Sequence, residues 1–342
     1  DLDNDFLLLF GDVFFDIDMF SFINFHKQNE SEITLFVHPN SHPYDSDLVV
    51  CNSEHRAIQW DSKHNIRNYD YNNLVNAGLY ILSKNVLGYI SNGGKKDLEK
   101  DLIVPAILDG RKVYAYHSTE YVKDMGTPDR YVAVELDVKK GIPKARNRTK
   151  KQKCIFLDRD GTINKYIGFV TRPEQMELLE NSAEAIRLIN SSEYLCIVIT
   201  NQPVIARGEC TFEELNGIHR RMETLLGKGH AYIDDLFFCP HHPHGGYEGE
   251  IPELKIECEC RKPKIKLFQE ASLKYNIDFE QSYMIGDSTI DIEAGRRAGL
   301  KTILVKTGES GKDGKYNTFA DYQVKNLLDA VKLILGKTSE QK

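Results

Sequence analysis

The sequence lacks the features of a membrane-spanning, secreted or nucleic-acid-binding protein. None of its uninterrupted apolar runs approaches the roughly 18 residues that a membrane-spanning helix needs. The apolar stretch around Phe6 follows Asp1, Asp3 and Asp5, whereas a signal peptide begins with basic residues. The formal net charge of −7 provides no overall positive field for a nucleic-acid backbone or an anionic membrane surface. We therefore expect no nucleic-acid partner, no membrane partner and a cytoplasmic location.

The composition is that of a folded protein with two domains. Hydrophobic residues make up 41% and charged residues 28% of the 342 residues, and this length suits two separate cores. Residues 138–153 contain eight Lys or Arg residues with Gly and Pro, which predicts a solvated basic linker. The predicted domains are residues 1–137 and 154–342. Because the chain begins with Asp rather than Met, whether residues precede it is left open, as is the oligomeric state.

The second predicted domain alternates apolar strands with amphipathic helices. The runs CIFLD, LCIVIT, LFFC, SYMIGD and KTILV are separated by helical patterns such as SAEAIRLIN and KLFQEASLKY. Continuous apolar strands with helices between them are typical of a parallel sheet that is covered on both faces. We predict a doubly wound α/β domain, in which ligands bind beyond the carboxyl ends of the strands.

Polar residues follow three of these strands. The first strand ends in Asp158-Arg-Asp160-Gly-Thr, the second in Thr200-Asn-Gln, and a later one in Gly-Asp287-Ser with Asp291 close behind. Converging carboxylates repel one another unless a cation lies among them, and hard oxygen ligands suit Mg²⁺. The sequence therefore predicts a magnesium site. The alternative is that Asp158 and Asp160 only cap a turn.

The ordered motifs DRDGT, TNQ, the lysine of CRKPK, and GDSTID resemble the haloacid dehalogenase superfamily of phosphatases over residues 154–330. The resemblance implies that Asp158 is the nucleophile and that Asp160 is the general acid and base. Thr200 and Lys262 would hold the phosphoryl oxygens. Asp158, Asp287 and the Asp160 carbonyl would bind Mg²⁺.

Three of the seven cysteines crowd into one short segment beside these motifs. Such clustering favours a metal site over a disulfide framework. The predicted ligands of a closed, structural zinc site are Cys239, His241, Cys258 and Cys260. His242 and His244 are spare imidazoles that could replace His241, and the alternative is a group of ordinary buried cysteines. Arg261 and Lys262 follow directly, so the zinc site would direct two cations toward the phosphate.

Within the superfamily, the runs IARGE, FFCPHHP and CECRKPK are similar to the D-glycero-D-manno-heptose-1,7-bisphosphate 7-phosphatases. This implies a phosphorylated sugar as substrate, with Asn201, Arg207 and Arg261 completing the substrate-binding set. Histidinol-phosphate phosphatases share the zinc loop and are the alternative. A non-catalytic sugar-phosphate-binding module is a second alternative. The sequence departs from the heptose enzymes at Pro203-Val204, where Ser-Gly is expected, and at Ser288, where lysine is usual.

The first domain resembles part of the sugar-1-phosphate nucleotidyltransferases. Asp12 follows an apolar strand, Asn76-Ala-Gly-Leu-Tyr80 matches the turn that lines the sugar pocket, and Asp124 begins an acidic turn that ends at Asp129. The resemblance implies a Mg²⁺ shared by Asp12 and Asp124. The Gly-rich nucleotide loop of that family is not found in the 342 residues, so we expect no nucleotide transfer by them; a completed domain would make the protein bifunctional. The alternative is that both acidic segments are ordinary turns.

Overall fold

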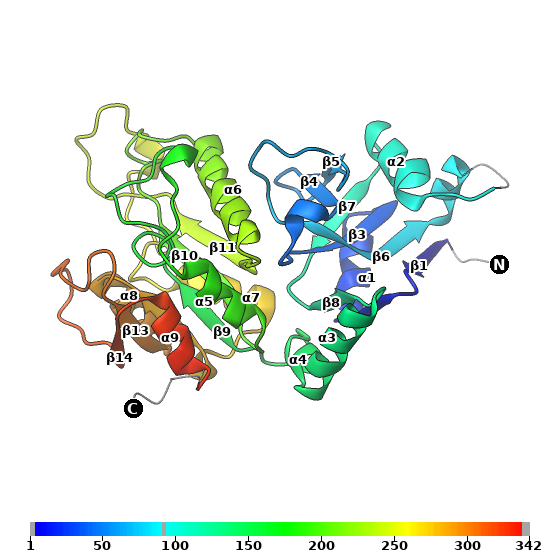
Figure 1. The fold of residues 1–342 in the computed structure, drawn as a ribbon. Coiled ribbons are helices and arrows are strands. Elements are labelled where there is room, and N and C mark those ends of the chain that lie inside the picture. The colour runs from blue at the N-terminus through cyan, green and yellow to red at the C-terminus, as the bar shows by residue number, and fades with distance from the viewer. Residues whose placement is uncertain (1–3, 91–93, 337–342) are drawn as a thin grey trace. The chain divides into compact units, whose positions relative to one another are not determined.

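The computed structural model describes residues 4–90 and 94–336 (Figure 1). The chain forms two compact units. The N-terminal unit contains Asp1–Asn68 and Asn72–Thr149, and the C-terminal unit contains Tyr69–Tyr71 and Lys150–Lys342. Both units mix strands and helices, which confirms the predicted α/β class.

The C-terminal unit is built on a six-stranded sheet with the order β11-β10-β9-β12-β13-β14. Its strands are β9 (Cys154–Leu157), β10 (Leu195–Asn201), β11 (Asp235–Cys239), β12 (Tyr283–Gly286), β13 (Lys301–Val305) and β14 (Tyr322–Val324). Every neighbouring pair is parallel, which confirms the predicted parallel sheet. The edge strand β14 was not predicted, because three partly exposed residues carry too little apolar pattern to indicate a strand.

Helices cover both faces of this sheet (Figure 1). They are α5 (Ser182–Asn190), α6 (Phe212–Lys228), α7 (Lys266–Tyr275), α8 (Thr289–Ala298) and α9 (Leu327–Ile334). Along β9, Ile155 and Leu157 pack with α5, α6 and α9, whereas Phe156 packs with α7 and α8 on the opposite face. This alternation follows from the two-residue period of a strand, and it makes both faces of the sheet apolar.

Two helices of the C-terminal unit begin with reciprocal capping bonds. At α6, Glu214 N donates to Thr211 Oγ1 at 3.1 Å, and Thr211 N donates to a Glu214 carboxylate oxygen at 2.7 Å. At α8, Ser288 N donates to Asp291 Oδ2 at 3.2 Å. Such bonds satisfy backbone groups that a helix start leaves unpaired, and they fix where each helix begins.

The N-terminal unit has a mixed sheet with the order β5-β4-β6-β3-β7, with β1 paired to β6 and a separate β2–β8 ribbon. Its strands are β1 (Asp5–Leu9), β2 (Val13–Asp16), β3 (Ile33–His38), β4 (Leu48–Cys51), β5 (Ala57–Asp61), β6 (Val75–Ser83), β7 (Val113–His117) and β8 (Tyr121–Asp124). Its helices are α1 (Met19–Gln28), α2 (Val104–Leu108), α3 (Pro128–Lys139) and α4 (Ile142–Ala145). Central strand β6 is antiparallel to β1, β3 and β4, and β3 is parallel to β7.

The segment 138–153, which was interpreted as a solvated linker, contains ordered structure. Helix α3 extends to Lys139, and α4 packs against β2 and β8. Ile142 and Pro143 in α4 are buried. The many cations of this segment predicted exposure to solvent, whereas in the structure these two apolar residues pack into the N-terminal unit.

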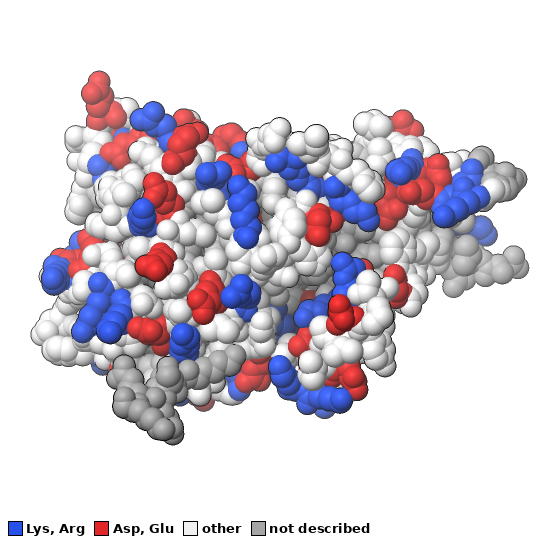
Figure 2. Space-filling view, viewed as in Figure 1, with Lys and Arg blue, Asp and Glu red and all other residues white. Residues whose placement is uncertain are grey.

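No helix within residues 4–90 and 94–336 is long and apolar enough to cross a membrane. Figure 2 shows Lys and Arg side chains interspersed with Asp and Glu over the face in view. The described residues on that face form no wide basic patch, in agreement with the net charge of −7.

Candidate active site

The strand ends of the C-terminal sheet bring the predicted catalytic residues together. Asp158 follows β9, Thr200 lies near the end of β10, and Asp287 follows β12. Because β9 lies between β10 and β12 in a parallel sheet, their carboxyl ends meet at one edge. The Asp158 backbone N–H donates to Ile285 O at 2.9 Å, which holds the start of the DRDGT loop against β12.

Lys262 is a buried cation at this edge. Its Nζ lies 2.6 Å from Asp158 Oδ1 and 2.6 Å from Asp291 Oδ1, and it donates to Ile199 O at 2.7 Å. The Asn201 amide accepts from Lys262 N at 2.9 Å and donates to Lys262 O at 3.2 Å, so it holds the backbone of Lys262. The structure thus gives Asn201 a positioning contact, and its predicted contact with substrate stays a prediction.

The carboxylates around Lys262 have perturbed acidity. Burial raises the pKa of Asp158 to about 7 despite Lys262, and burial followed by the charge of Asp291 raises the pKa of Asp287 to about 8. Burial opposes the charge on Lys262, but the two carboxylates that contact it raise its pKa above the usual range. Repulsion among carboxylates is relieved when a cation binds among them.

The geometry of these carboxylates fits a metal ion. Oxygen atoms of Asp158, Asp287 and Asp291 all lie within 4.8 Å of one another. Hard oxygen donors in this number leave room for waters and substrate oxygens around a small divalent cation. Asp291 lies in the GDSTID motif but was not among the predicted metal ligands. The side chain of Asp160 is not part of this group. The contact of its backbone carbonyl with Mg²⁺ stays a prediction.

Two glycines allow loops to approach Asp287 closely. Gly161 and Gly308 have φ values of +80° and +55°. A Cβ atom at either position would lie 2.3 Å and 2.0 Å, respectively, from Asp287 Oδ2. The same oxygen accepts a hydrogen bond from Glu309 N at 2.6 Å. Only residues without a side chain therefore fit on both sides of this carboxylate.

Asp160 is held by four hydrogen-bonding groups that sequence reasoning did not identify. Arg159 Nη2 donates to its two oxygens at 3.0 and 2.7 Å. Gln202 Nε2 and Asn164 Nδ2 each donate at 2.9 Å, and Arg159 Nε is 3.3 Å away. Arg159 is fully buried. The signal in the sequence was a cation between two aspartates directly after a buried strand, but only the fold shows that it turns inward.

The four predicted zinc ligands form one cluster. Five distances among the Sγ atoms of Cys239, Cys258 and Cys260 and the Nδ1 atom of His241 lie between 3.2 and 3.6 Å. These values approach the edge of about 3.8 Å expected for a tetrahedron with metal–sulfur bonds of about 2.3 Å. His242, a predicted substitute, instead contacts the backbone oxygen of His244 at 3.0 Å.

The loop between the zinc ligands packs on the segment that follows β10. Ala206 N donates to Pro240 O at 3.3 Å, and Ile251 N donates to Ala206 O at 3.0 Å. Arg261 Nη1 donates to His241 O at 3.2 Å. The backbone of His241 therefore holds the Arg261 side chain, and the predicted direction of Arg261 and Lys262 toward the phosphate stays a prediction.

Arg207 stacks between two aromatic rings. Its Cζ lies 4.4 Å from the Phe169 ring centre and 4.2 Å from that of Tyr247, and Nη2 lies 2.6 Å from Glu209 Oε1. This cation–π stack joins the segment after β10 to the loop between the zinc ligands. The structure shows this contact for Arg207, whose predicted contact with substrate remains a prediction.

The two departures from the heptose enzymes have structural roles. Val204 is fully buried and packs in the core beneath the sheet edge. Ser288 Oγ donates to Asp291 Oδ2 at 2.6 Å, while the other Asp291 oxygen contacts Lys262. Ser288 therefore orients a carboxylate of the metal group.

The acidic residues predicted for the N-terminal unit lie beside one another. Asp12 lies in the turn between β1 and β2, and Asp124 ends β8. A Cβ atom on Gly126 would be 3.0 Å from an oxygen of each. Asp124 is also paired with Arg130 at 2.7 Å, and both side chains are about half exposed, at 49% and 50%. The two aspartates alone do not complete a metal site.

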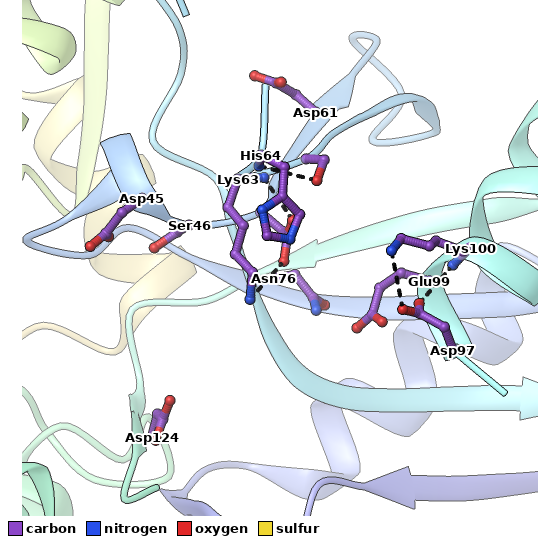
Figure 3. Close-up of polar contacts among 12 residues, drawn as sticks. Asp45, Ser46, Asp61, Lys63, His64, Asn76, Asp97, Glu99, Lys100 and Asp124 are labelled. Atoms are coloured by element: carbon purple, nitrogen blue, oxygen red, sulfur yellow. Dashed lines mark hydrogen bonds and ion pairs between the residues drawn. The ribbon is translucent and has the colours of Figure 1, made fainter. Parts of the chain in front are cut away.

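A second polar cluster of this unit lies apart from Asp124 (Figure 3). Asn76 Nδ2 donates to Tyr80 Oη at 2.7 Å, and that hydroxyl lies 3.5 Å from Glu99 Oε1. Burial raises the pKa of Glu99. Sequence reasoning singled out Asn76 and Tyr80 but missed Glu99, which also lines a surface pocket of about 540 Å³ with Phe10.

The segment Asn76–Tyr80 was expected to be a turn, and this expectation was wrong. These residues lie inside strand β6. Gly78 has a φ of +74°, and the pairing of β6 with β3 shifts register nearby. Gly78, which suggested a turn in the sequence, instead lies at an irregularity within the strand.

Comparisons with known proteins agree with this geometry. The HAD-hydrolase-like family model matches residues 259–330, and the nucleotidyl transferase model matches residues 1–141. A D-glycero-beta-D-manno-heptose-1,7-bisphosphate 7-phosphatase of Pasteurella multocida is 37% identical over 190 residues, 55% of this chain and 100% of that protein. The D-glycero-alpha-D-manno-heptose-1,7-bisphosphate 7-phosphatase of Photorhabdus laumondii is 38% identical over 188 residues, 54% of this chain and 97% of that protein.

Among solved structures, the D,D-heptose 1,7-bisphosphate phosphatase of B. bronchiseptica, complexed with magnesium and phosphate, covers 55% of this chain and 100% of its own. The two are 29% identical, with a TM-score of 0.48.

The strand-end aspartates, the buried lysine and the parallel sheet define a phosphatase of the haloacid dehalogenase type. The chain is 37–38% identical to two curated relatives over nearly their whole length, which identifies the family within this class. The chain belongs to the family of D-glycero-D-manno-heptose-1,7-bisphosphate 7-phosphatases.

Proposed function

We propose that the C-terminal unit removes the 7-phosphate of D-glycero-D-manno-heptose 1,7-bisphosphate through an aspartyl-phosphate on Asp158. The observation that carries this proposal is the pairing of a buried nucleophile with a buried cation, Asp158 Oδ1 to Lys262 Nζ at 2.6 Å. The relatives named for this substrate support the sugar assignment.

The residues of the site account for both halves of the reaction. A carboxylate oxygen of Asp158 attacks phosphorus, the bond from phosphorus to the sugar oxygen breaks, and a proton from Asp160 makes the leaving oxygen an alcohol. Water then attacks the aspartyl-phosphate, gives a proton to Asp160, and releases phosphate with regeneration of the Asp158 carboxylate. Lys262 and Thr200 neutralise and orient the phosphoryl oxygens.

Mg²⁺ is the proposed cation of the carboxylate group, because Asp158, Asp287 and Asp291 provide clustered hard oxygen donors. When bound, it would neutralise charge on the transferring phosphoryl group. Zn²⁺ is the proposed ion of the Cys₃His cluster, where it would be structural. Its ligands flank the loop that contacts Ala206, and Cys260 precedes Arg261, so this ion would order the wall of the substrate site.

A turnover panel tests the substrate. The chain should release phosphate from heptose 1,7-bisphosphate with a kcat/KM at least about 100-fold above that for histidinol phosphate, because loss of matched polar contacts is costly. Both anomers should be included, since the relatives are named for either one. Release of the 1-phosphate, or a preference for histidinol phosphate, would contradict the proposal.

For the N-terminal unit we propose binding of a sugar 1-phosphate, supported by its match to the nucleotidyl transferase model and by the Asn76–Tyr80–Glu99 chain. Glu99 would accept hydrogen bonds from sugar hydroxyls. Calorimetry with heptose 1-phosphate on an Asp158→Asn chain isolates this site from turnover. Glu99→Gln should weaken binding by about tenfold; equal affinity for the two chains would contradict the proposal.

A further inference from the structure

Arg159 lies between the two reactive aspartates, and its guanidinium group has no exposed surface. Nη2 donates to both oxygens of Asp160 and also to Gln202 Oε1 at 3.0 Å. A planar guanidinium that contacts both oxygens of a carboxylate fixes the plane of that carboxylate as well as its position. The orientation of Asp160 therefore depends on the orientation of Arg159.

The other end of the guanidinium contacts His219, a residue of α6. Arg159 Nη1 lies 3.3 Å from His219 Nε2. Arginine can only donate, so Nε2 must be the acceptor and the ring must carry its proton on Nδ1. His219 is 6% exposed, and burial followed by the charge of Arg159 lowers its pKa well below the usual range. Both observations agree with a neutral imidazole that accepts this hydrogen bond.

Helix α6 holds His219 firmly in place. Leu215, Ile218 and Met222 lie on the same buried face of the helix and pack in the core of the C-terminal unit. The capping bonds at Thr211 fix the helix start, and the His219 ring lies 5.5 Å from that of Phe238. The imidazole is therefore a fixed acceptor rather than a mobile surface group.

We propose that His219 is a positioning residue for phosphate-ester hydrolysis, because its hydrogen bond holds Arg159 in the orientation that presents the Asp160 carboxyl to the leaving oxygen. This inference rests on the proposed chemistry at Asp158 and Asp160. Without the acceptor, a buried N–H of Arg159 loses its partner. The guanidinium then turns toward another acceptor, and the carboxyl group that it holds turns with it.

The leaving group provides the readout. In the first half-reaction the bond from phosphorus to the ester oxygen breaks, and the proton of Asp160 moves to that oxygen. A weakly basic leaving group departs without much help from this proton, whereas a strongly basic one depends on it. Misplacing the general acid should therefore slow esters of basic alcohols more than esters of acidic phenols. A general loss of structure would slow all of them alike.

The experiment compares the whole chain with His219→Leu and His219→Gln on 2,4-dinitrophenyl, 4-nitrophenyl and phenyl phosphate, whose leaving groups increase in basicity in this order. For His219→Leu, kcat/KM, which reports formation of the aspartyl-phosphate, should fall about 30-fold on phenyl phosphate and about threefold on the dinitrophenyl ester. The Gln side chain can accept from Arg159, so His219→Gln should restore kcat/KM to within about threefold of the parent. His26→Leu, which removes a buried histidine of the N-terminal unit, is the matched control and should leave all three esters unaffected.

If His219→Leu does not fold, Arg159→Lys provides an independent test of the role of the guanidinium. It keeps the charge but loses the two-pronged contact, so it should show the same dependence on the leaving group. Equal losses on all three esters, or no rescue by Gln, would overturn the inference and leave the proposed function standing. A parent chain that releases phosphate neither from these esters nor from heptose 1,7-bisphosphate would overturn both.

Discussion

The acidic clusters of the two units differ in how their charges are balanced. In the C-terminal unit, Asp158 and Asp291 share the buried ammonium of Lys262, and Asp160 contacts the buried guanidinium of Arg159. In the N-terminal unit, Asp124 is paired with Arg130 where both side chains are about half exposed. Exposed pairs contribute about 0–1 kcal/mol, whereas buried charges that lose a partner are costly. The comparison shows that the C-terminal site is fixed by its fold, while the N-terminal pair is weakly held.

The largest expected effect is the loss of the nucleophile. Asp158→Asn should reduce phosphate release by at least about 10³-fold, because the amide cannot form the aspartyl-phosphate. The Asn oxygen can still accept from Lys262, which keeps Asp291 as a charged partner, and repulsion among the carboxylates is relieved, so the melting temperature should change little. Phosphate assay and thermal unfolding of the purified chain measure the two quantities. Activity within tenfold of the parent would show that another group attacks phosphorus.

Disrupting the zinc cluster should have the next largest effect. Metal analysis should find about one zinc per chain, and Cys260→Ser should lose it, lower the melting temperature and reduce kcat by about 100-fold as Arg261 and Lys262 lose their support. Cys51→Ser in the N-terminal unit is the matched control. A reduced, carefully purified parent without zinc would mean that the four residues are ordinary polar and core groups.

Replacing the stacked arginine should have a moderate effect. Arg207→Lys keeps the charge but loses the planar stack with Phe169 and Tyr247. The loss should destabilise the packing of the two segments that carry these rings by about 1–2 kcal/mol. We expect kcat/KM for the sugar bisphosphate to fall about tenfold. Arg187→Lys, on the exposed side of α5, provides the control. An unchanged kcat/KM would show that the stack does not shape the substrate site.

The smallest effect is expected in the N-terminal unit. Asp124→Asn removes a half-exposed ion pair, so the free energy of unfolding should change by less than about 1 kcal/mol. Phosphate release should stay within about twofold of the parent, because the catalytic residues all belong to the C-terminal unit. A larger loss of phosphatase activity would show that the two units are coupled, and would break the comparison above.

The features that could be predicted from the sequence were those set by short spacing or by strand period. The Cys-Pro-His and Cys-Glu-Cys segments have the short ligand spacing that predicts a metal site. The aspartates at the strand ends could be predicted to meet because the carboxyl ends of parallel strands lie at one edge of the sheet. Helix α5 matches its predicted range of residues 182–190.

The features that could not be predicted depend on side-chain direction or on distant packing. His219 and Arg159 are in contact although they are 60 positions apart in the sequence. The helical spacing of His219 predicts only that it is a core residue. Asp291 was not assigned as a metal ligand, because its closeness to Asp158 depends on where α8 begins, and the sequence alone does not give that distance. Helix α4 was missed because buried Ile142 and Pro143 lie among many basic residues.

The close approach of two loops to Asp287 has a genetic consequence. Every missense change in the codon for Gly161 or Gly308 introduces a Cβ atom, which would overlap with the Oδ2 atom of that carboxylate. The backbone at both positions also has a positive φ that other residues rarely adopt. Among randomly mutated genes selected for phosphatase activity, these two codons should therefore accumulate only synonymous changes.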